Sequence, residues 1–187
     1  MAHWLYRNLQ AVVDRIVVCD LRRNACIAKD GDMDGPIDAG KPAVLLRGIY
    51  LREVYRSDDD RHVLLKQWVS LYHDRVREAV LQNNKLRGRC RMYGVRPHRG
   101  ALRDPSVRFR WLKCLEDRAL VKQLSLLWIG LNAVLDQVVQ SRREVSRLGR
   151  RHQIIRYWGE LPGVGPIRAA TLFAYLDTPL RFRHRRK

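Results

Sequence analysis

The sequence has few cysteines and no hydrophobic run long enough to cross a membrane. Its four cysteines, Cys19, Cys26, Cys90 and Cys114, form no Cys-x-x-Cys pair and have no histidine partner at zinc-finger spacing. No apolar run approaches the roughly 20 residues of a membrane-spanning helix, and the first ten residues lack the apolar centre of a signal peptide. These absences disfavour disulfide-stapled, zinc-finger and membrane-spanning classes, and they predict a soluble cytoplasmic protein with reduced thiols.

Acidic residues are scarce in the last two thirds of the chain. Residues 1–60 hold nine Lys+Arg and ten Asp+Glu, whereas residues 61–187 hold 28 and nine. The formal net charge of +18 and the pI near 10.7 therefore arise after residue 60. Such an excess predicts attraction to a polyanion, for which nucleic acid is the commonest candidate and an anionic membrane surface the rival.

Helical periodicity dominates from residue 58 onward. Apolar residues recur every three or four positions over 58–94, which predicts one long amphipathic helix that ends at Gly94. A basic linker follows, and a second long helix is expected from Pro105 to about Leu148. Neither helix can bury its apolar stripe alone, so we expect them to pair antiparallel as in a coiled coil, within the chain or with a second copy.

The first 56 residues have an α/β pattern instead. Residues 4–13 and 21–28 have helical spacing, residues 15–20 are typical of a short buried strand, and residues 51–57 of an edge strand. The acidic stretch 29–40 predicts a loop that leads into a helix with Asp38 in its first turn.

The stretch LPGVG, residues 161–165, predicts a tight turn between two helices. Glycine accepts positive φ, so Gly163 and Gly165 can expose backbone N–H groups beside a helix N-terminus that favours anions. Such a turn is typical of a helix-hairpin-helix, in which Gly163, Val164, Gly165, Ile167 and Arg168 would hold one DNA phosphate. A plain corner between packed helices is the alternative.

Other candidates are weaker. Arginines cluster at two expected bends, which favours nucleic-acid contact at Arg96, Arg99, Arg150 and Arg151. Trp68, Trp111 and Trp128 have the spacing of helix packing rather than of base stacking. The run Asp58–Asp60 is typical of a helix N-terminus rather than of a metal site.

Two stretches resemble one family. The C-terminal YWGELPGVGPIRAATLFAYLDTPLRFRHRRK and the N-terminal VVCDLRRNACIAKDGDMDGPIDAGKPAVLLRGIYLREVY resemble the DEDD-type insertion-sequence transposases, which are bridge-RNA-guided recombinases. The resemblance covers nearly the whole chain. It implies an RNase H-like domain whose four acidic residues bind Mg²⁺, a coiled-coil dimerisation segment, and a C-terminal domain that supplies a nucleophilic serine.

The resemblance also argues against this chemistry here. Asp38 matches the last acid of the family motif, but Gly35 stands where the third acid is expected. The other two acids and the serine are expected beyond the two ends, as in a chain truncated at both. A single carboxylate does not hold Mg²⁺ tightly, because a hard cation needs several oxygen ligands.

The expected fold is therefore mainly α, with a partial RNase H-like α/β segment, long antiparallel coiled-coil helices and a C-terminal helix-hairpin-helix. We expect an RNase H-like remnant over 1–56, a long-helix region over 57–150, and the start of a helix-hairpin-helix domain over 151–187. The expected function is DNA binding in transposition or recombination of an insertion sequence, by a catalytically defective chain associated with the nucleoid. The expected partners are DNA, a structured guide RNA and a second copy held through the long helices, with no membrane partner.

Three alternatives remain. In the first, the chain is a stand-alone dimeric helix-hairpin-helix protein or regulator. In the second, it is a general basic protein that coats nucleic acid. In the third, it is an active enzyme with rearranged metal ligands such as Asp30 and Asp32. Equal affinity for any duplex, with no effect of valine at Gly163 or Gly165, would favour the coating protein. Mg²⁺-dependent nicking that is lost in Asp38→Ala would favour the enzyme.

Overall fold

A computed structural model describes residues 3–19, 35–48, 50–51, 53–57, 59–98, 100–102 and 104–178, without the side chains of residues 3 and 35–39. The chain divides into two compact units, Met1–Asp58 and Asp59–Lys187. The described residues form seven helices and no strand, which confirms the expectation of a mainly α protein.

The first unit contains α1 (His3–Gln10) and α3 (Gly35–Arg47), which carries Asp38 in its first turn as predicted. The two predicted strands are wrong as continuous elements within the described residues. Their segments meet only at an antiparallel bridge between Cys19 and Glu53, where the Val54 N–H donates to the Val18 carbonyl at 2.7 Å. A single bridge is not a sheet, so an RNase H-like core is not seen in this part of the chain. The helix predicted for 21–28 lies outside the described residues.

The first long helix is α4 (Asp60–Met92), and both predicted ends are confirmed. Asp59 is the N-cap, and its carboxylate accepts from the Arg61 N–H at 2.9 Å. The chain leaves the helix through Gly94, whose φ of 66° lies in the left-handed region that glycine adopts without strain. The acidic run before α4 thus caps a helix, as its position suggested.

The second predicted helix is broken in two, which corrects the expectation of one helix from Pro105 to Leu148. The chain forms α5 (Pro105–Lys113) and then α6 (Arg118–Gly149). Each has its own N-cap, since Asp104 accepts from the Ser106 and Val107 N–H groups and Asp117 from those of Ala119 and Leu120. The break lets α5 fold back, and Trp111 meets Trp128 edge-on at 5.7 Å between ring centroids.

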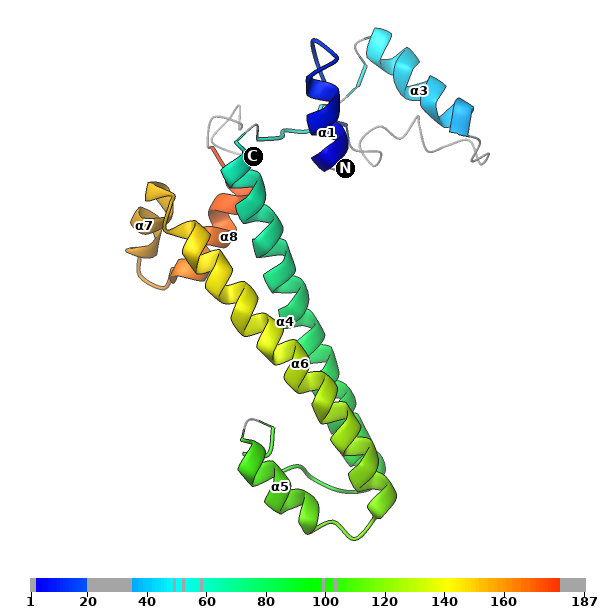
Figure 1. Cartoon of the computed structure of the whole chain (residues 1–187), viewed down its shortest axis with the longest axis vertical. Coiled ribbons are helices and arrows are strands. Elements are labelled where there is room, and N and C mark those ends of the chain that lie inside the picture. The colour runs from blue at the N-terminus through cyan, green and yellow to red at the C-terminus, as the bar shows by residue number, and fades with distance from the viewer. Residues whose placement is uncertain are drawn as a thin grey trace. The chain divides into compact units, whose positions relative to one another are not determined.

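The two long helices run antiparallel, side by side, as Figure 1 shows. The end of α4 packs on the start of α6 in one core, which contains Leu86, Cys90, Leu120, Leu124, Trp128 and Leu131. Burial raises the pKa of the Cys90 thiol in this core. The predicted pairing therefore forms within the chain, and Trp68, Trp111 and Trp128 pack against the cores as expected.

The last two helices, α7 (Gln153–Gly159) and α8 (Pro166–Leu176), close a second core at the other end of this hairpin. It contains Leu65, Val69, Val145, Leu148, Ile155, Ala169, Ala170 and Ala174. The three alanines let α8 approach α4 and α6 closely. The boundary predicted at residue 150 is therefore not a break in packing, because helices on both sides of it share this core.

The expectation that no segment is long and apolar enough to cross a membrane needs a correction, because by length and composition alone α6 is the one helix of the described residues that could do so. This is weak evidence, because core helices of soluble proteins pass the same test. In this structure α6 packs along α4 over much of its length, with nine of its residues buried.

Candidate nucleic-acid interface

The predicted turn joins α7 to α8. Leu161 accepts from the Val164 N–H at 3.0 Å, which closes the turn, and Gly163 adopts a φ of 79°. Gly165 differs, because it is the N-cap of α8 with φ −74° and ψ 168°, a conformation open to any residue. Only one of the two glycines therefore has the positive φ that both were free to adopt.

Four N–H groups of this turn donate to no protein acceptor in the described part of the chain: those of Gly163, Gly165, Ile167 and Arg168. Two of them, Ile167 and Arg168, belong to the first turn of α8, where a helix has no internal acceptors. Pro166 lies between Gly165 and Ile167 and has no N–H to satisfy. Free N–H groups at a helix N-terminus attract anions, because the positive end of the helix dipole lies there.

Arg168 lies over the same turn. Its Nη1 donates to the Gly163 carbonyl at 2.7 Å, and the side chain is exposed. This hydrogen bond stabilises the turn. The guanidinium also places a positive charge beside the four N–H groups. An arginine has five donors, so four remain for a ligand after this bond.

Two cavities flank the turn. One, of about 670 Å³, lies between Gly163–Val164 and α4, and its lining includes His73 and Arg142. His73 Nε2 is 3.0 Å from the Thr171 hydroxyl, so this histidine is tied to α8. The other, of about 320 Å³, lies beside Pro166 and is lined in part by Arg150 and Arg156.

Sequence reasoning missed Arg142 and Arg156 as neighbours of the turn. They lie inside helices α6 and α7, whereas the sequence favoured arginines at bends. For Arg142 the available signal was helical register, since position 142 lies next to the buried Ser141 and one turn after Val138.

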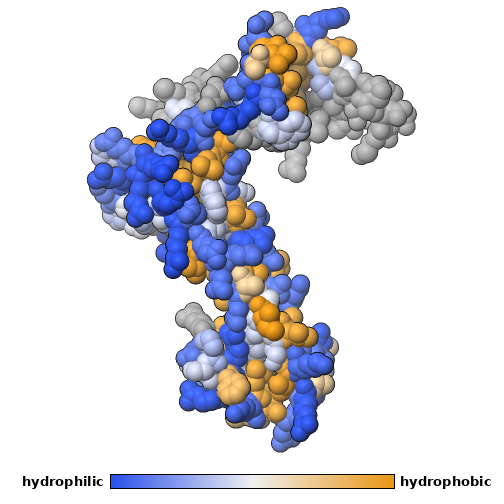
Figure 2. Space-filling model, viewed as in Figure 1, coloured by the Kyte–Doolittle hydropathy of each residue, from blue (hydrophilic) through white to orange (hydrophobic). Residues whose placement is uncertain are grey.

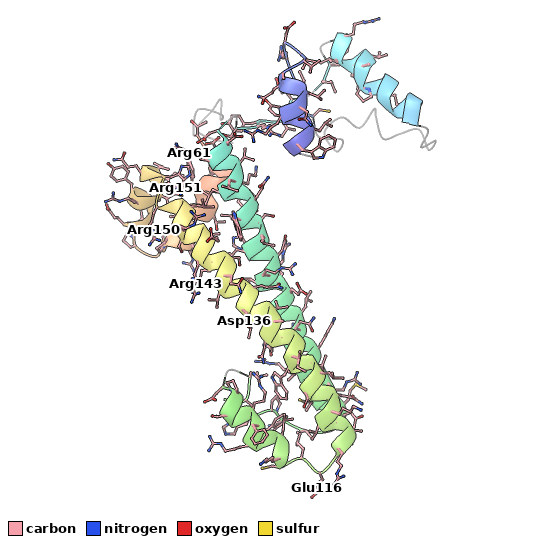
Figure 3. All side chains as sticks on the ribbon, in the orientation of Figure 1. Arg61, Glu116, Asp136, Arg143, Arg150 and Arg151 are labelled. Carbon is pink, nitrogen blue, oxygen red and sulfur yellow. The ribbon has the colours of Figure 1, made fainter. Side chains whose placement is uncertain are left out.

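Of the weaker predicted contacts, Arg150 and Arg151 lie at the C-terminal end of α6. They form an exposed basic edge there with Arg143, and Arg61 lies at the start of α4 (Figure 3). Figure 2 shows a strongly hydrophilic surface over α7 and α8. Arg96 is exposed but lies between α4 and α5, at the other end of the long helices, and Arg99 lies outside the described residues.

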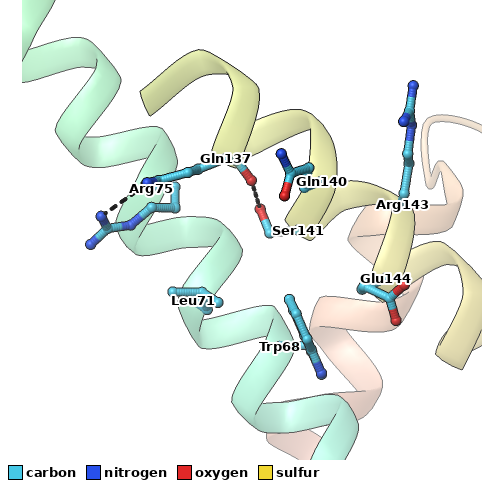
Figure 4. A pocket seen from close by; sticks show the side chains of 8 residues that line it. All are labelled: Trp68, Leu71, Arg75, Gln137, Gln140, Ser141, Arg143 and Glu144. Atoms are coloured by element: carbon cyan, nitrogen blue, oxygen red, sulfur yellow. Dashed lines mark hydrogen bonds between the residues drawn. The ribbon is translucent and has the colours of Figure 1, made fainter. Parts of the chain in front are cut away.

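A further pocket, of about 620 Å³, opens between α4 and α6 (Figure 4). Several of its polar groups already have partners. Arg75 donates to the Gln137 side-chain oxygen at 3.2 Å and pairs with Glu78 at 2.8 Å, while the Ser141 hydroxyl donates to the Gln137 carbonyl at 2.7 Å. No activated nucleophile or pair of carboxylates lines it, so this pocket suggests no catalytic constellation.

Two serines outside this pocket have hydroxyls that are engaged in the same way. Ser125 donates to the Val121 carbonyl at 2.8 Å, and Ser106 donates to the Asp104 carboxylate at 2.7 Å as part of a helix cap. Their hydroxyls donate to a helix carbonyl and to a helix-capping carboxylate.

The acidic positions give no metal site among the described side chains. No group of three His, Cys, Asp or Glu side chains lies together there. Asp38 and Gly35 are placed in α3 by their backbones, but the carboxylate of Asp38 is outside the description, as are Asp30 and Asp32. The Mg²⁺ site that the family resemblance implies therefore stays a prediction, and no chemical step is assigned to it.

Comparisons with protein-family models, with curated proteins and with solved structures found no match for this chain. The interface described above therefore rests on the residues themselves. It consists of the four N–H groups of residues 163–168, Arg168, and the flanking arginines Arg142, Arg150 and Arg156, and we call it the turn site.

Proposed function

We propose that this chain binds DNA through its sugar-phosphate backbone at the turn site. One observation supports this most strongly: four unpaired N–H groups surround the start of α8 beside the exposed guanidinium of Arg168. Backbone amides at a helix N-terminus bind phosphate oxygens, which carry no sequence information, so we expect the affinity to depend on salt and to vary little with sequence.

The helices around the turn support a helix-hairpin-helix interpretation. Ile155 and Trp158 of α7 pack with Ala169, Ala170 and Phe173 of α8, so the two helices hold the turn rigidly. A rigid turn keeps its N–H groups in place before the ligand arrives, which lowers the entropy lost on binding.

The biological setting that we propose is transposition or recombination of an insertion sequence, in a cytoplasmic protein associated with the nucleoid. This part rests on the sequence resemblance alone. Gly35 stands where the family motif has an acid, and a glycine cannot ligate a cation through its side chain. We therefore propose binding without strand cleavage by this chain, with a structured guide RNA as a second partner.

A second candidate function, a dimeric DNA-binding regulator, is favoured by an apolar groove along the long helices. The groove has a volume of about 350 Å³, and we call it the stem groove. It is lined by Val76, Ala79, Val80, Asn83, Arg87, Leu102, Leu131, Leu135 and Val138. If a second copy of the chain covered this groove, it would bury apolar surface that is otherwise exposed to solvent.

The experiment is a titration of a labelled 20-base-pair duplex by fluorescence anisotropy at several salt concentrations. We expect affinity to fall steeply with salt and to be similar for unrelated sequences. Gly163→Val forces a β-branched residue to positive φ and should lower the affinity about tenfold or more. Arg77→Gln, which removes an exposed charge on α4 outside the turn site, is the control for a general loss of charge.

Equal affinity in the wild type and in Gly163→Val would exclude phosphate binding at the turn site. It would favour a general basic protein that coats nucleic acid. A nicking assay with Mg²⁺ tests the remaining alternative. Cleavage that is lost in Asp38→Ala would show an active enzyme and contradict the proposal of binding without catalysis.

A further inference from the structure

A larger excess of positive charge than that near the turn site lies in another part of the chain. Residues 85–113, which we call the tip, contain ten Lys+Arg and one acid, whereas residues 142–168 contain seven and two. The tip comprises the last turns of α4, the linker and α5, at the opposite end of the long helices (Figure 1). Since α4 has 33 residues, about 50 Å long, one phosphate cannot contact both ends.

The charges of the tip are not neutralised from within. No ion pair involves a tip residue in the described part of the chain. The one acid, Asp104, is occupied as the cap of α5, and its hydrogen bonds from Ser106 hold the pKa of its carboxyl below the usual value. Unpaired like charges repel one another, so a polyanion bound at the tip would relieve this repulsion.

One face of α5 combines these charges with an aromatic ring. Its inner face carries Val107, Arg108, Trp111 and Leu112, which are buried or half-buried. Among them, Arg108 donates to the Ala101 carbonyl and to Asn132 at 3.1 Å each, so α5 is fixed to its surroundings.

Its outer face carries Ser106, Phe109, Arg110 and Lys113, all exposed. Phe109 is 59% exposed, and the Lys113 ammonium lies 4.4 Å from its ring centroid. Two more apolar side chains are exposed where α4 ends, Met92 (75%) and Tyr93 (41%). The exposed Phe109 ring contributes little buried apolar surface to the core. It offers a flat surface, with cations beside it, on which a base can stack.

We infer that the tip is a second nucleic-acid site, one that takes an unpaired segment. A base stacks on Phe109, and the neighbouring phosphates contact Arg110, Lys113 and the arginines at the end of α4. Double-stranded DNA keeps its base faces stacked inside the helix, so a stacking surface selects single-stranded or looped nucleic acid. Lys113 can move from the ring to a phosphate, because its side chain is long and exposed.

This inference rests on the proposed function in its claim that the chain binds nucleic acid, but it concerns a different site and a different ligand form. An acidic protein is the competing occupant of such a surface. Charge alone would suit it, whereas the exposed ring with its flanking cations favours a ligand that has both bases and phosphates.

The test uses the full chain with two labelled probes, a 12-nucleotide oligothymidine and a 20-base-pair duplex, at one fixed salt concentration. Phe109→Leu removes the aromatic face and keeps the size and apolarity. We expect it to weaken oligothymidine binding about tenfold and to leave duplex binding unchanged. Phe109→Trp should restore or strengthen binding, because a larger ring stacks better.

Two matched controls separate the sites. Tyr157→Leu removes an exposed ring near the turn site and should not affect oligothymidine binding. Gly163→Val should weaken binding of the duplex and leave binding of oligothymidine unchanged. Arg110→Gln and Lys113→Gln should each reduce the salt dependence of oligothymidine binding, by about 0.7 in the slope of log K against log salt.

The outcomes are distinguishable. Oligothymidine binding that is unchanged in Phe109→Leu, or a loss that is equal for both probes, overturns the stacking site. A wild type that binds oligothymidine through Phe109 but does not bind the duplex overturns the turn site and supports the tip. Binding of a polyglutamate peptide that competes with oligothymidine and is equally sensitive to Phe109→Leu would assign the surface to an acidic protein instead.

Discussion

His62, in the first turn of α4, donates through Nε2 to the main-chain carbonyl of Phe173 on α8 at 3.1 Å. Its ring also meets the Phe173 ring edge-on, with 5.1 Å between the centroids. On the Phe173 ring lies a second histidine, His152, with a centroid distance of 4.8 Å. Residues from the start of α4, the N-cap of α7 and the end of α8 thus meet at one phenylalanine.

The first prediction is that acid weakens this junction through His152. Burial lowers the pKa of His152 below its ordinary value of about 6.5, and the other nearby groups are Asp59, His62, Arg61 and Asp177. Because the folded protein resists protonation at this site, the contribution of neutral His152 to the free energy of unfolding is fully present above about pH 6.5. It falls as the pH drops below that value, by at most about 1.4 kcal/mol per pH unit for one group.

The measurement is the free energy of unfolding in urea from pH 5 to 8. His152→Phe keeps a ring on Phe173 and removes the titrating group, so its curve should be flatter between pH 5 and 6.5. An equal loss of unfolding free energy in acid in both proteins would show that His152 is not responsible.

The second prediction separates the two glycines of the turn by stability. Gly163→Ala places a Cβ at φ 79°, which costs about 1–2 kcal/mol, although no atom lies within 4 Å of that position. Gly165→Ser should be neutral or slightly stabilising, because serine is a preferred N-cap and the backbone there is extended. Thermal unfolding of both variants checks this, and an equal loss in the two would contradict the distinction.

The third prediction concerns the cap that starts α6. Asp117 accepts from the N–H groups of Ala119 and Leu120 at 2.8 and 2.9 Å, so Asp117→Ala should cost about 1 kcal/mol. Asp136→Ala, an exposed aspartate within the same helix, is the control and should change the free energy of unfolding by less than about 0.5 kcal/mol. A control as destabilised as the cap variant would mean that general charge balance, not capping, stabilises α6.

Sequence patterning predicted the long helices well because their signals are local. Asp59 before the apolar stripe and Gly94 after it mark both ends of α4, and such caps act within a few residues. The break before α6 was missed although Asp117 is an equally good cap. Apolar spacing continues across Leu115, so the stripe looked unbroken; the return of Trp111 onto Trp128 is a tertiary contact that periodicity does not encode.

For the turn site, composition predicted the residues of the turn but not their surroundings. Gly163, Gly165 and Arg168 were visible from the sequence because glycine and proline mark turns strongly. Arg142 and Arg156 come near the turn only when α8 packs on α4 and α6, which requires the alanines of α8 and partners about 100 residues away. The tip was seen as a basic linker, and the exposure of Phe109 depends on which face of α5 packs inward.

The last prediction concerns the stem groove and a second copy of the chain. Val80 is 54% exposed at this groove, beside Leu135 of α6, so an apolar partner surface would cover both. Val80→Glu would place a charge in that interface without disturbing a buried core, and should raise the dimer dissociation constant at least about tenfold. Sedimentation equilibrium measures this constant directly.

Gln67→Glu is the control, because it adds the same charge at an exposed position on α4 outside the groove. It should leave the dimer intact. A wild type that is monomeric at all concentrations contradicts dimerisation through the long helices. A dimer that resists Val80→Glu would place the interface on another surface of the chain, since a buried unpaired carboxylate is incompatible with a tight apolar contact.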